Sequence, residues 1–183
     1  MIKIIVTLCI SIVVITFTHG QTYRGKNGKV KFFSDAPLED IEAVSNETNS
    51  VFKPSTGEVA VLIPIKSFKF DKALMREHFN QTYLESDKYP EATFIGKLKD
   101  KIDENTPIDK VVMISGKISI HGVVKDRNIQ VTLKSGANGL LTASGKFMIT
   151  LTDHKIKVPR LVFQNIAEVI EVSFELNLSQ MDQ

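Results

Sequence analysis

The chain has 183 residues, a formal net charge of +2 at pH 7, and hydrophobic residues at 43% of its positions. This length and this apolar share suit a single domain that buries its own core. A net charge so close to zero argues against a nucleic-acid partner, for which a basic surface is expected.

The first twenty residues have the features of a secretory signal peptide. Lys3 provides a positive start, residues 4–17 form an uncharged and mostly apolar run, and Gly20 ends a short segment of the kind that a signal peptidase cleaves. We therefore expect cleavage between Gly20 and Gln21 and a periplasmic or secreted protein. Retention of the segment as a membrane anchor is the alternative, although the run is shorter than the about 20 apolar residues of a membrane span.

The mature domain would then comprise residues 21–183. It would contain no cysteine, because Cys9 is the only cysteine in the chain, so it could form no disulfide and no cysteine metal site. No internal repeat, low-complexity tract or long linker divides these residues. We expect one domain that its own core stabilises, with no membrane span after cleavage.

The N-terminal part of this domain alternates apolar and polar residues, which is typical of strands. Residues 25–34 are the first predicted strand, with Val30 and Phe32 on its inner face. Residues 41–45 are predicted to form a short second strand. The polar residues 46–50 that follow are predicted to form a loop.

The clearest strand pattern covers residues 58–70, after a turn at residues 53–57. The residues on its inner face are Val59, Val61, Ile63 and Ile65. Pro64 has no amide to donate, so we expect it at an edge, a bulge or a bend. Phe68 and Phe70 extend the pattern towards the next element.

One amphipathic helix is predicted over about residues 72–84. Asp71 is a suitable N-cap, because its carboxylate can accept hydrogen bonds from the free amides of the first turn. Pro90 lies beyond the helix, where a residue without an amide hydrogen ends the pattern. The residues that form the apolar stripe are Leu74, Met75, His78, Phe79, Thr82 and Tyr83. A lone helix of this kind must bury its stripe, and the mouth of a closed sheet is the expected place.

Further strand patterns follow the helix. They cover residues 92–98, 111–120, 123–133, 141–151 and 168–178. Turns are predicted at His121-Gly122 and at residues 135–139. The total of about eight alternating strands indicates an antiparallel sheet with one wet face. Alternation alone leaves a sandwich and an up-and-down barrel open, and such a barrel has room for side chains or one small ligand.

Several stretches of the chain together resemble the YceI-like polyisoprenoid-binding family of exported bacterial proteins. These stretches are residues 77–98, 115–133, 144–159 and 166–176. Their most specific parts are the segment KYPEATF at residues 88–94 and the segment IHGV at residues 120–123. The resemblance spans the chain from about Lys29 to Leu178.

The resemblance implies a mainly β fold, an antiparallel eight-stranded lipocalin-like barrel with the helix lying at the barrel. It also implies a long isoprenoid chain held in the barrel interior. On this basis we expect a non-catalytic binding protein, a carrier or store for an isoprenoid or other long-chain amphiphile. Leu74 and Met75 depart from the family, since many members carry a charged helix residue there.

The candidate lining residues are apolar and lie at predicted inner positions of the strands or on the helix stripe. They are Val30, Phe32, Val61, Ile63, Phe68, Phe70, Leu74, Phe79, Phe94, Ile114, Ile118, Phe147, Ile149, Val172 and Phe174. The alternative is that they form a filled core without a cavity. His78 is the candidate for contact with a polar head group, and a partly buried structural histidine is its alternative.

No catalytic motif accompanies these residues. The chain has no H-E-x-x-H, G-x-S-x-G, G-x-G-x-x-G or P-loop sequence, so we expect no catalytic residue, no cofactor and no metal. The rival interpretation is a structural or interaction domain of the cell envelope, with a filled barrel and a protein partner at its rim. The sequence does not decide between a monomer and a dimer.

Overall fold

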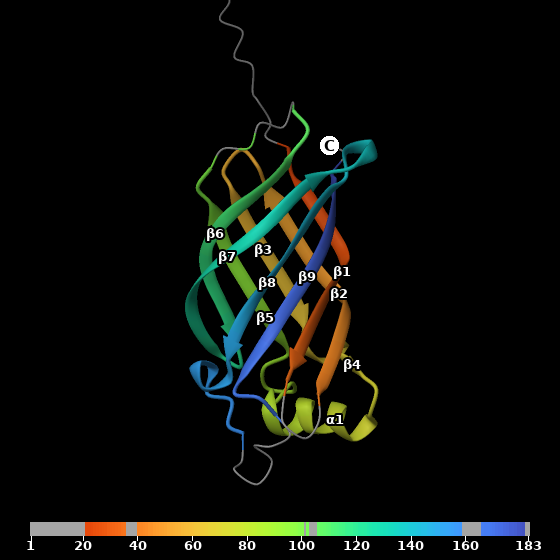
Figure 1. The fold of residues 1–183 in the computed structure, drawn as a ribbon, viewed down its shortest axis with the longest axis vertical. Coiled ribbons are helices and arrows are strands. Elements are labelled where there is room, and N and C mark those ends of the chain that lie inside the picture. The colour runs from red at the N-terminus through yellow and green to blue at the C-terminus, as the bar shows by residue number, and fades with distance from the viewer. Residues whose placement is uncertain (1–20, 36–39, 101, 103–105, 159–165, 182–183) are drawn as a thin grey trace, which may run out of the picture.

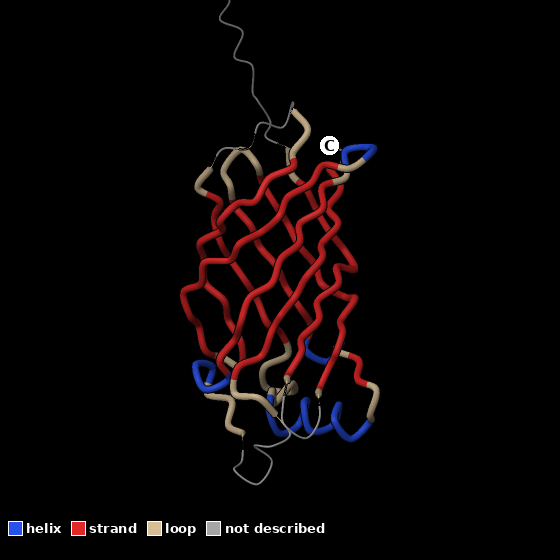
Figure 2. The backbone as a smooth tube through the Cα atoms, in the orientation of Figure 1, coloured by secondary structure: helices blue, strands red, loops and turns tan. Residues whose placement is uncertain are grey.

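The computed structural model describes residues 21–35, 40–100, 102, 106–158 and 166–181. In this part of the chain one antiparallel β-sheet closes on itself (Figures 1 and 2). Its strands are β1 Tyr23–Ser34, β2 Ile41–Lys53, β3 Glu58–Pro64, β4 Lys69–Phe70, β5 Glu91–Leu98, β6 Asp109–Ile120, β7 Val123–Ser135, β8 Leu141–Thr150 and β9 Val169–Gln180. The strand order is β1-β9-β8-β7-β6-β5-β3-β2, and β1 also pairs with β2. The eight long strands therefore form the predicted closed barrel, and the two-residue β4 lies beside β2.

The two ends of the barrel carry different elements (Figure 1). The first, which we call the turn end, carries the β2–β3 turn at residues 54–57 and the 3₁₀ turn η3, Ala137–Gly139. The second, which we call the helix end, carries α1, Ala73–His78, and the 3₁₀ turn η4, Leu151–His154. The tight turn between β6 and β7 also lies at the helix end.

That turn follows from its two residues. His121 and Gly122 both have positive φ angles, 51° and 71°, and Ile120 pairs directly with Val123 across them. Two consecutive residues with positive φ form the turn whose twist matches an antiparallel hairpin. The predicted turn at these residues is confirmed.

Alternation along the strands explains which side chains the barrel encloses. In β6, Val112, Ile114 and Ile118 are buried, whereas Met113 is 48% exposed. Successive side chains of a strand point to opposite faces of the sheet, so every second residue reaches the interior. The inner faces predicted for β5 to β9 agree with the buried residues of those strands.

The barrel wall is not equally bonded along its length. β6 and β7 pair from Asp109↔Lys134 to Ile120↔Val123, but β7 and β8 pair only from Thr132↔Ser144 to Ser135↔Leu141. These four residue pairs lie near the turn end. Towards the helix end β7 and β8 therefore separate, as the ribbons in Figures 1 and 2 show, and the wall encloses a wider space there.

The loop predicted at residues 46–50 is wrong, because these residues belong to the long strand β2. Thr48 and Ser50 are buried at 0% and 4% exposure, and they pair with Gly28 and Gly25 of β1. A Cβ atom on Gly25 would lie 2.5 Å from Oγ of Ser50. Only small side chains fit at this contact. Thr48 and Ser50 therefore do not show the alternating apolar pattern from which strands were predicted.

Pro64 ends β3 and begins a bend, as predicted. The 3₁₀ turn η1, Ile65–Ser67, follows it, and β4 then pairs with Ala43 and Val44 of β2. The Ser67 hydroxyl donates to the carbonyl oxygen of Pro64 at 2.6 Å, which closes the bend. This bend turns the chain towards the helix end.

The predicted helix at residues 72–84 is shorter and less buried than expected. α1 begins after Lys72, with no side-chain cap, so Asp71 is not the N-cap. A π-helical turn, η2 Phe79–Tyr83, follows α1, and the amide of Leu84 donates to the carbonyl of Phe79 at 2.9 Å. A π turn adds a residue to the helical repeat, so the apolar stripe that regular spacing predicts does not form. No residue of α1 is buried.

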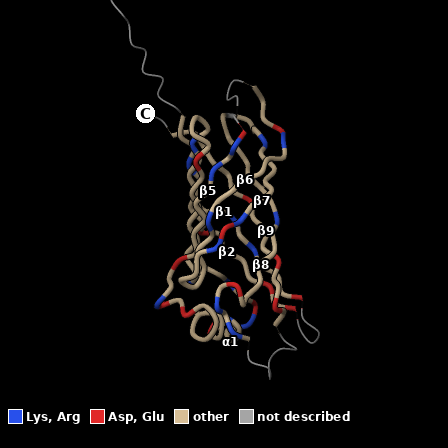
Figure 3. Tube along the Cα trace, turned by 90° about the vertical axis from the view of Figure 1, so that its left-hand side faces the viewer, with Lys and Arg blue, Asp and Glu red and all other residues tan. Residues whose placement is uncertain are grey.

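Basic and acidic residues are interspersed along the chain of the barrel in the view of Figure 3. Several are paired across neighbouring strands, among them Lys31 with Glu42 at 2.6 Å and Lys117 with Asp126 at 2.9 Å. Within the described residues no helix has both the length and the apolar character that a membrane crossing needs. The predicted signal peptide, residues 1–20, lies outside the described residues.

Candidate functional site

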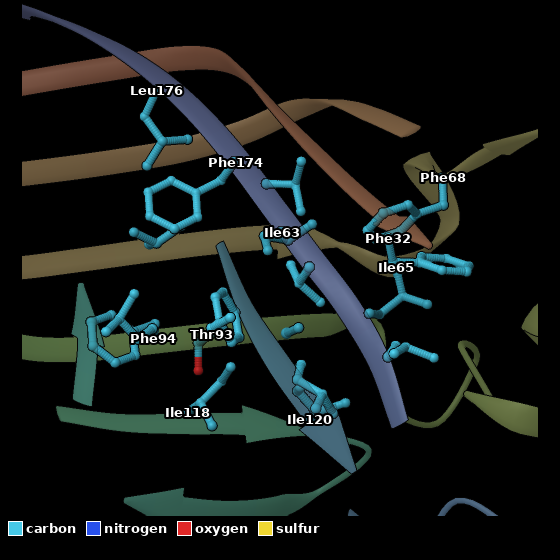
Figure 4. A pocket seen from close by; sticks show the side chains of 18 of the residues that line it. Phe32, Ile63, Ile65, Phe68, Thr93, Phe94, Ile118, Ile120, Phe174 and Leu176 are labelled. Carbon is cyan, nitrogen blue, oxygen red and sulfur yellow. The ribbon is translucent and has the colours of Figure 1, made fainter. Parts of the chain in front are cut away.

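The barrel contains a cavity of about 170 Å³ that extends from the helix end towards the turn end as far as Val59 of β3 and Ala143 of β8. Figure 4 shows it from close by, with Phe94 and Phe174 towards one end and Phe32 and Phe68 towards the other. The lining residues are Val30, Phe32, Val59, Val61, Ile63, Ile65, Phe68, Phe79, Leu84, Ala92, Thr93, Phe94, Ile114, Ile118, Ile120, Ile129, Val131, Ala143, Phe147, Ile149, Leu151, Ile156, Ile170, Val172, Phe174 and Leu176. Thr93 has the only polar side chain among them, so the space suits a hydrocarbon and offers little to a charged group.

The turn-end half of the barrel is filled by a cluster that we call the plug. Its members are Phe52, Leu98, Val112, Leu133, Leu141 and Leu178, all at most 5% exposed. None of them lines the cavity. The interior is therefore hollow on one side of the barrel and closed on the other.

An aromatic cluster lies at the helix end of the cavity. Phe32, Phe68, Phe70 and Phe79 contact one another with ring centroids 5.0–5.7 Å apart. Phe32 and Phe79 are stacked, with an angle of 16° between their planes. Through Phe79 the helical segment reaches the cavity, although α1 itself stays outside the core.

Thirteen of the fifteen candidate lining residues line the cavity. They are Val30, Phe32, Val61, Ile63, Phe68, Phe79, Phe94, Ile114, Ile118, Phe147, Ile149, Val172 and Phe174. Phe70 packs in the aromatic cluster but is not a lining residue. Leu74 was wrongly assigned to the lining, because it is 61% exposed on α1.

His78 is exposed on α1 and does not line the cavity. It therefore shares no surface with the apolar space in which a tail would lie. Its assignment as a head-group contact rested on the helix stripe, and that stripe is absent from α1.

Some lining residues were not among the candidates. Leu84 and Ile156 come from connecting segments, where no alternation marks an inner face. Ala92 of β5 and Ala143 of β8 also line the cavity. Their small side chains leave space that larger residues would fill.

A polar cluster lies beside the helix end of the cavity. Nε2 of His121 lies 2.7 Å from a carboxylate oxygen of Glu85, and its Nδ1 lies 3.1 Å from the carbonyl oxygen of His154. Both partners are acceptors, so the two hydrogen bonds form together only with the doubly protonated ring. The Tyr89 ring meets His121 edge-on, with centroids 4.6 Å apart.

His154 is fully buried in this cluster. Its Nδ1 lies 3.2 Å from the carbonyl oxygen of Val123 and so carries the hydrogen, while Nε2 has no partner among the described residues. Burial lowers the pKa of His154, and the nearby Arg127 acts in the same direction. The neutral ring is therefore favoured in the fold.

The polar cluster holds together three segments that each supply a cavity wall. Leu84 precedes Glu85, Ile120 precedes His121, and Leu151 belongs to the same turn as His154. The cluster thus fixes the cavity's helix end without placing a polar side chain inside it. No three metal-ligating side chains come together within the described part of the chain.

A sequence profile of the YceI-like domain matches residues 11–178. Three solved structures share the fold. A polyisoprenoid-binding domain from Saccharophagus degradans has 14% identity and a TM-score of 0.74, covering 88% of this chain and 99% of that one. Burkholderia cenocepacia BcnA has 17% identity and a TM-score of 0.68, with coverage of 82% and 95%. The YceI protein of Campylobacter jejuni has 21% identity and a TM-score of 0.61, with coverage of 80% and 88%. No curated protein sequence matches the chain.

Proposed function

We propose that this chain, which belongs to the YceI-like domain family, binds the apolar tail of an isoprenoid or similar lipid inside its barrel. It carries or stores the ligand and performs no chemistry on it. The observation that supports this most is the cavity of about 170 Å³ with a wall that is apolar apart from Thr93. A dry space of this kind suits an apolar occupant better than water, because water there would find no hydrogen-bonding partners.

Burial of hydrocarbon alone provides enough free energy for such binding. Each buried CH₂ group contributes about 0.8 kcal/mol, so a five-carbon isoprene unit contributes on the order of 3–4 kcal/mol. Association costs about 4–15 kcal/mol. On the order of two units therefore offset the lower end of that cost, and polar contacts outside the cavity would only add to the affinity.

The rival interpretation, a filled barrel with a protein partner at its rim, requires an interior without space. The plug fills one half in this way, but the cavity occupies the other. We therefore favour the binding role over a scaffold role.

A ligand-displacement experiment with two matched variants tests the proposal. Ala92 lines the cavity, whereas Ala60 is exposed on the outer face of β3. We expect Ala92→Phe to fill the cavity and weaken the binding of a dansyl-labelled geranyl probe, displaceable by geraniol, by at least about tenfold. Ala60→Phe should bind like the unmodified protein. Equal binding by both variants would place the probe outside the barrel and contradict the proposal.

We also propose that the protein acts outside the cytoplasm after removal of residues 1–20. The apolar run after Lys3 and the cysteine-free remainder support this. Expression of the full chain in a bacterial host, followed by osmotic release of the periplasm and intact-mass measurement, tests it. The expected mass begins at Gln21, and an uncleaved protein in the cytoplasmic fraction would contradict export.

A further inference from the structure

Two aromatic rings occupy the barrel interior because the strands beneath them lack side chains. A Cβ atom on Gly96 would lie 2.7 Å from Cε1 and Cζ of Phe94, and one on Gly116 would lie 2.9 Å from the same Cζ. On the other side, a Cβ atom on Gly145 would lie 2.8 Å from Cζ of Phe174. All three distances are too short for real atoms, so each ring lies against bare backbone.

Both rings stand at the boundary between the cavity and the plug. Phe94 and Phe174 line the cavity. Along β5, Phe94 is followed at the next inner positions by Gly96 and then by Leu98 of the plug. Along β9, Phe174 is followed by Leu176, the last cavity-lining residue of this strand, and then by Leu178 of the plug. A tail that enters from the helix end therefore meets these rings before it meets the plug (Figure 4).

The space in front of the rings is small. Its volume of about 170 Å³ is close to that of an engineered cavity of about 150 Å³ that accepts one benzene molecule. A group of about six carbon atoms therefore fits without rearrangement, and a tail of on the order of two isoprene units fits with small shifts of the lining. A longer tail has to displace either the rings or the plug.

The plug resists such displacement more than the rings do. Leu98, Leu133 and Leu178 are at most 3% exposed, so they are packed on all sides. The ring of Phe174 is only partly buried, because one side of it faces the cavity. Phe94 has the glycine pair below it and the cavity above it. The two rings are therefore the surface on which the end of a tail comes to rest.

We propose that Phe94 and Phe174, each seated on glycine backbone, set the length of tail that the barrel accepts, and that they select short prenyl or acyl tails of on the order of one to two isoprene units. This inference rests on the proposed binding function and names its ligand class. It differs from the long chain expected from the family resemblance, and the difference comes from the plug and the two rings.

The test measures the affinity of the full chain for prenol, geraniol, farnesol and geranylgeraniol, each of which has one isoprene unit more than the one before. For the unmodified protein, affinity should rise up to geraniol and then stop rising. Phe94→Ala and Phe174→Ala should move the longest well-bound tail to farnesol. The ratio of farnesol to geraniol affinity should rise on the order of a hundredfold where a whole further unit becomes buried.

Two further variants distinguish a specific limit on tail length, set by the two rings, from a general effect of enlarging the cavity. Phe68→Ala also removes a lining phenyl ring, but at the helix end, so it should leave the length limit unchanged. Gly96→Ala should have the opposite effect to Phe94→Ala, because the three atoms nearest to its methyl group are side-chain atoms of Phe94 and Ile114, and the methyl group pushes the Phe94 ring into the cavity. It should therefore favour prenol over geraniol. Because Gly96→Ala removes no core group, it also tests the idea if an alanine variant fails to fold.

The outcomes distinguish the two proposals. If the unmodified protein binds prenols but Phe94→Ala, Phe174→Ala and Gly96→Ala keep its length limit, the two rings are not the stop and binding stands. If Phe68→Ala shifts the limit as much as Phe94→Ala does, the inference is also wrong. If no prenol binds the unmodified protein at all, the binding function fails and the length limit fails with it.

Discussion

The two halves of the barrel have the same strand pattern but different interiors. In the turn-end half, the leucines of the plug fill the space between closely bonded strands. In the helix-end half, β7 and β8 separate, and alanines and valines leave the cavity open. Alternation therefore decides which side chains point inward. Residue size and strand separation decide whether these side chains fill the interior or leave a cavity. A binding protein needs both halves, since the filled one stabilises the fold that keeps the other open.

The largest expected difference between the two halves is in the free energy of unfolding of variants at two neighbouring inner leucines of β9. Leu178 belongs to the plug and is 3% exposed, whereas Leu176 is the next inner residue and lines the cavity. We expect Leu178→Ala to lower the free energy of unfolding by about 3–4 kcal/mol. Leu176→Ala should lower it by at least about 1 kcal/mol less, because one side of Leu176 already lacks packing partners. Urea unfolding measures both.

Equal losses for the two leucine variants would mean that both halves are packed alike. In that case the cavity would not exist in solution, and the binding function would lose its main support.

A smaller effect is expected at His154, which stabilises the wall at the helix end. Its pKa is lowered by burial in the folded chain and returns to about 6.5 on unfolding. The unfolded state therefore binds more protons below about pH 6.5, so stability is complete above that pH and falls as the pH drops towards the folded-state pKa.

The variant His154→Gln tests whether His154 causes this loss of stability at low pH. Thermal unfolding at pH 7.5 and pH 5.0 should show a loss of stability for the unmodified protein that is clearly reduced in the variant. The variant should also be less stable at pH 7.5, by about 1–2 kcal/mol, because a buried ring is replaced at a hydrogen-bonded position. His78→Gln, on the exposed face of α1, serves as control and should change neither value. If His154→Gln had the same pH dependence of stability as the unmodified protein, His154 would not be its cause.

The smallest effect is expected at Leu74, in the helical segment that was predicted to close the barrel. Leu74 is 61% exposed, whereas Leu84 is 8% exposed and lines the cavity. Leu74→Lys should change the free energy of unfolding by less than about 0.5 kcal/mol, and Leu84→Ala by about 2 kcal/mol or more. A large loss for Leu74→Lys in urea unfolding would show that α1 buries its leucine after all.

These comparisons also show what the sequence could predict. The inner face of β6 was clear, because Val112, Ile114 and Ile118 alternate with polar or exposed residues. β2 was partly missed, because Thr48 and Ser50 are small polar residues packed against glycines. Their fit depends on the opposite strand, which a pattern along one segment does not reveal.

The cavity was harder to predict than the barrel. Inner positions follow from alternation, and most of the candidate residues line the cavity for this reason. The same pattern holds, however, for Leu178 in the plug and Leu176 at the cavity. The depth of a residue along the barrel depends on register and on where β7 leaves β8. The π turn after α1 was not visible either, because the apolar spacing of this segment fits a regular α-helix.

The central claim is that the helix-end half of the barrel holds an apolar tail. Mass spectrometry of an organic-solvent extract of the purified full-length protein tests it most directly, with Ala92→Phe extracted in parallel. We predict an apolar-tailed compound in stoichiometric amount from the unmodified protein and its loss from Ala92→Phe. Equal amounts of the same compound from both proteins, or an empty extract from a protein that also takes up no added geraniol, would contradict the account.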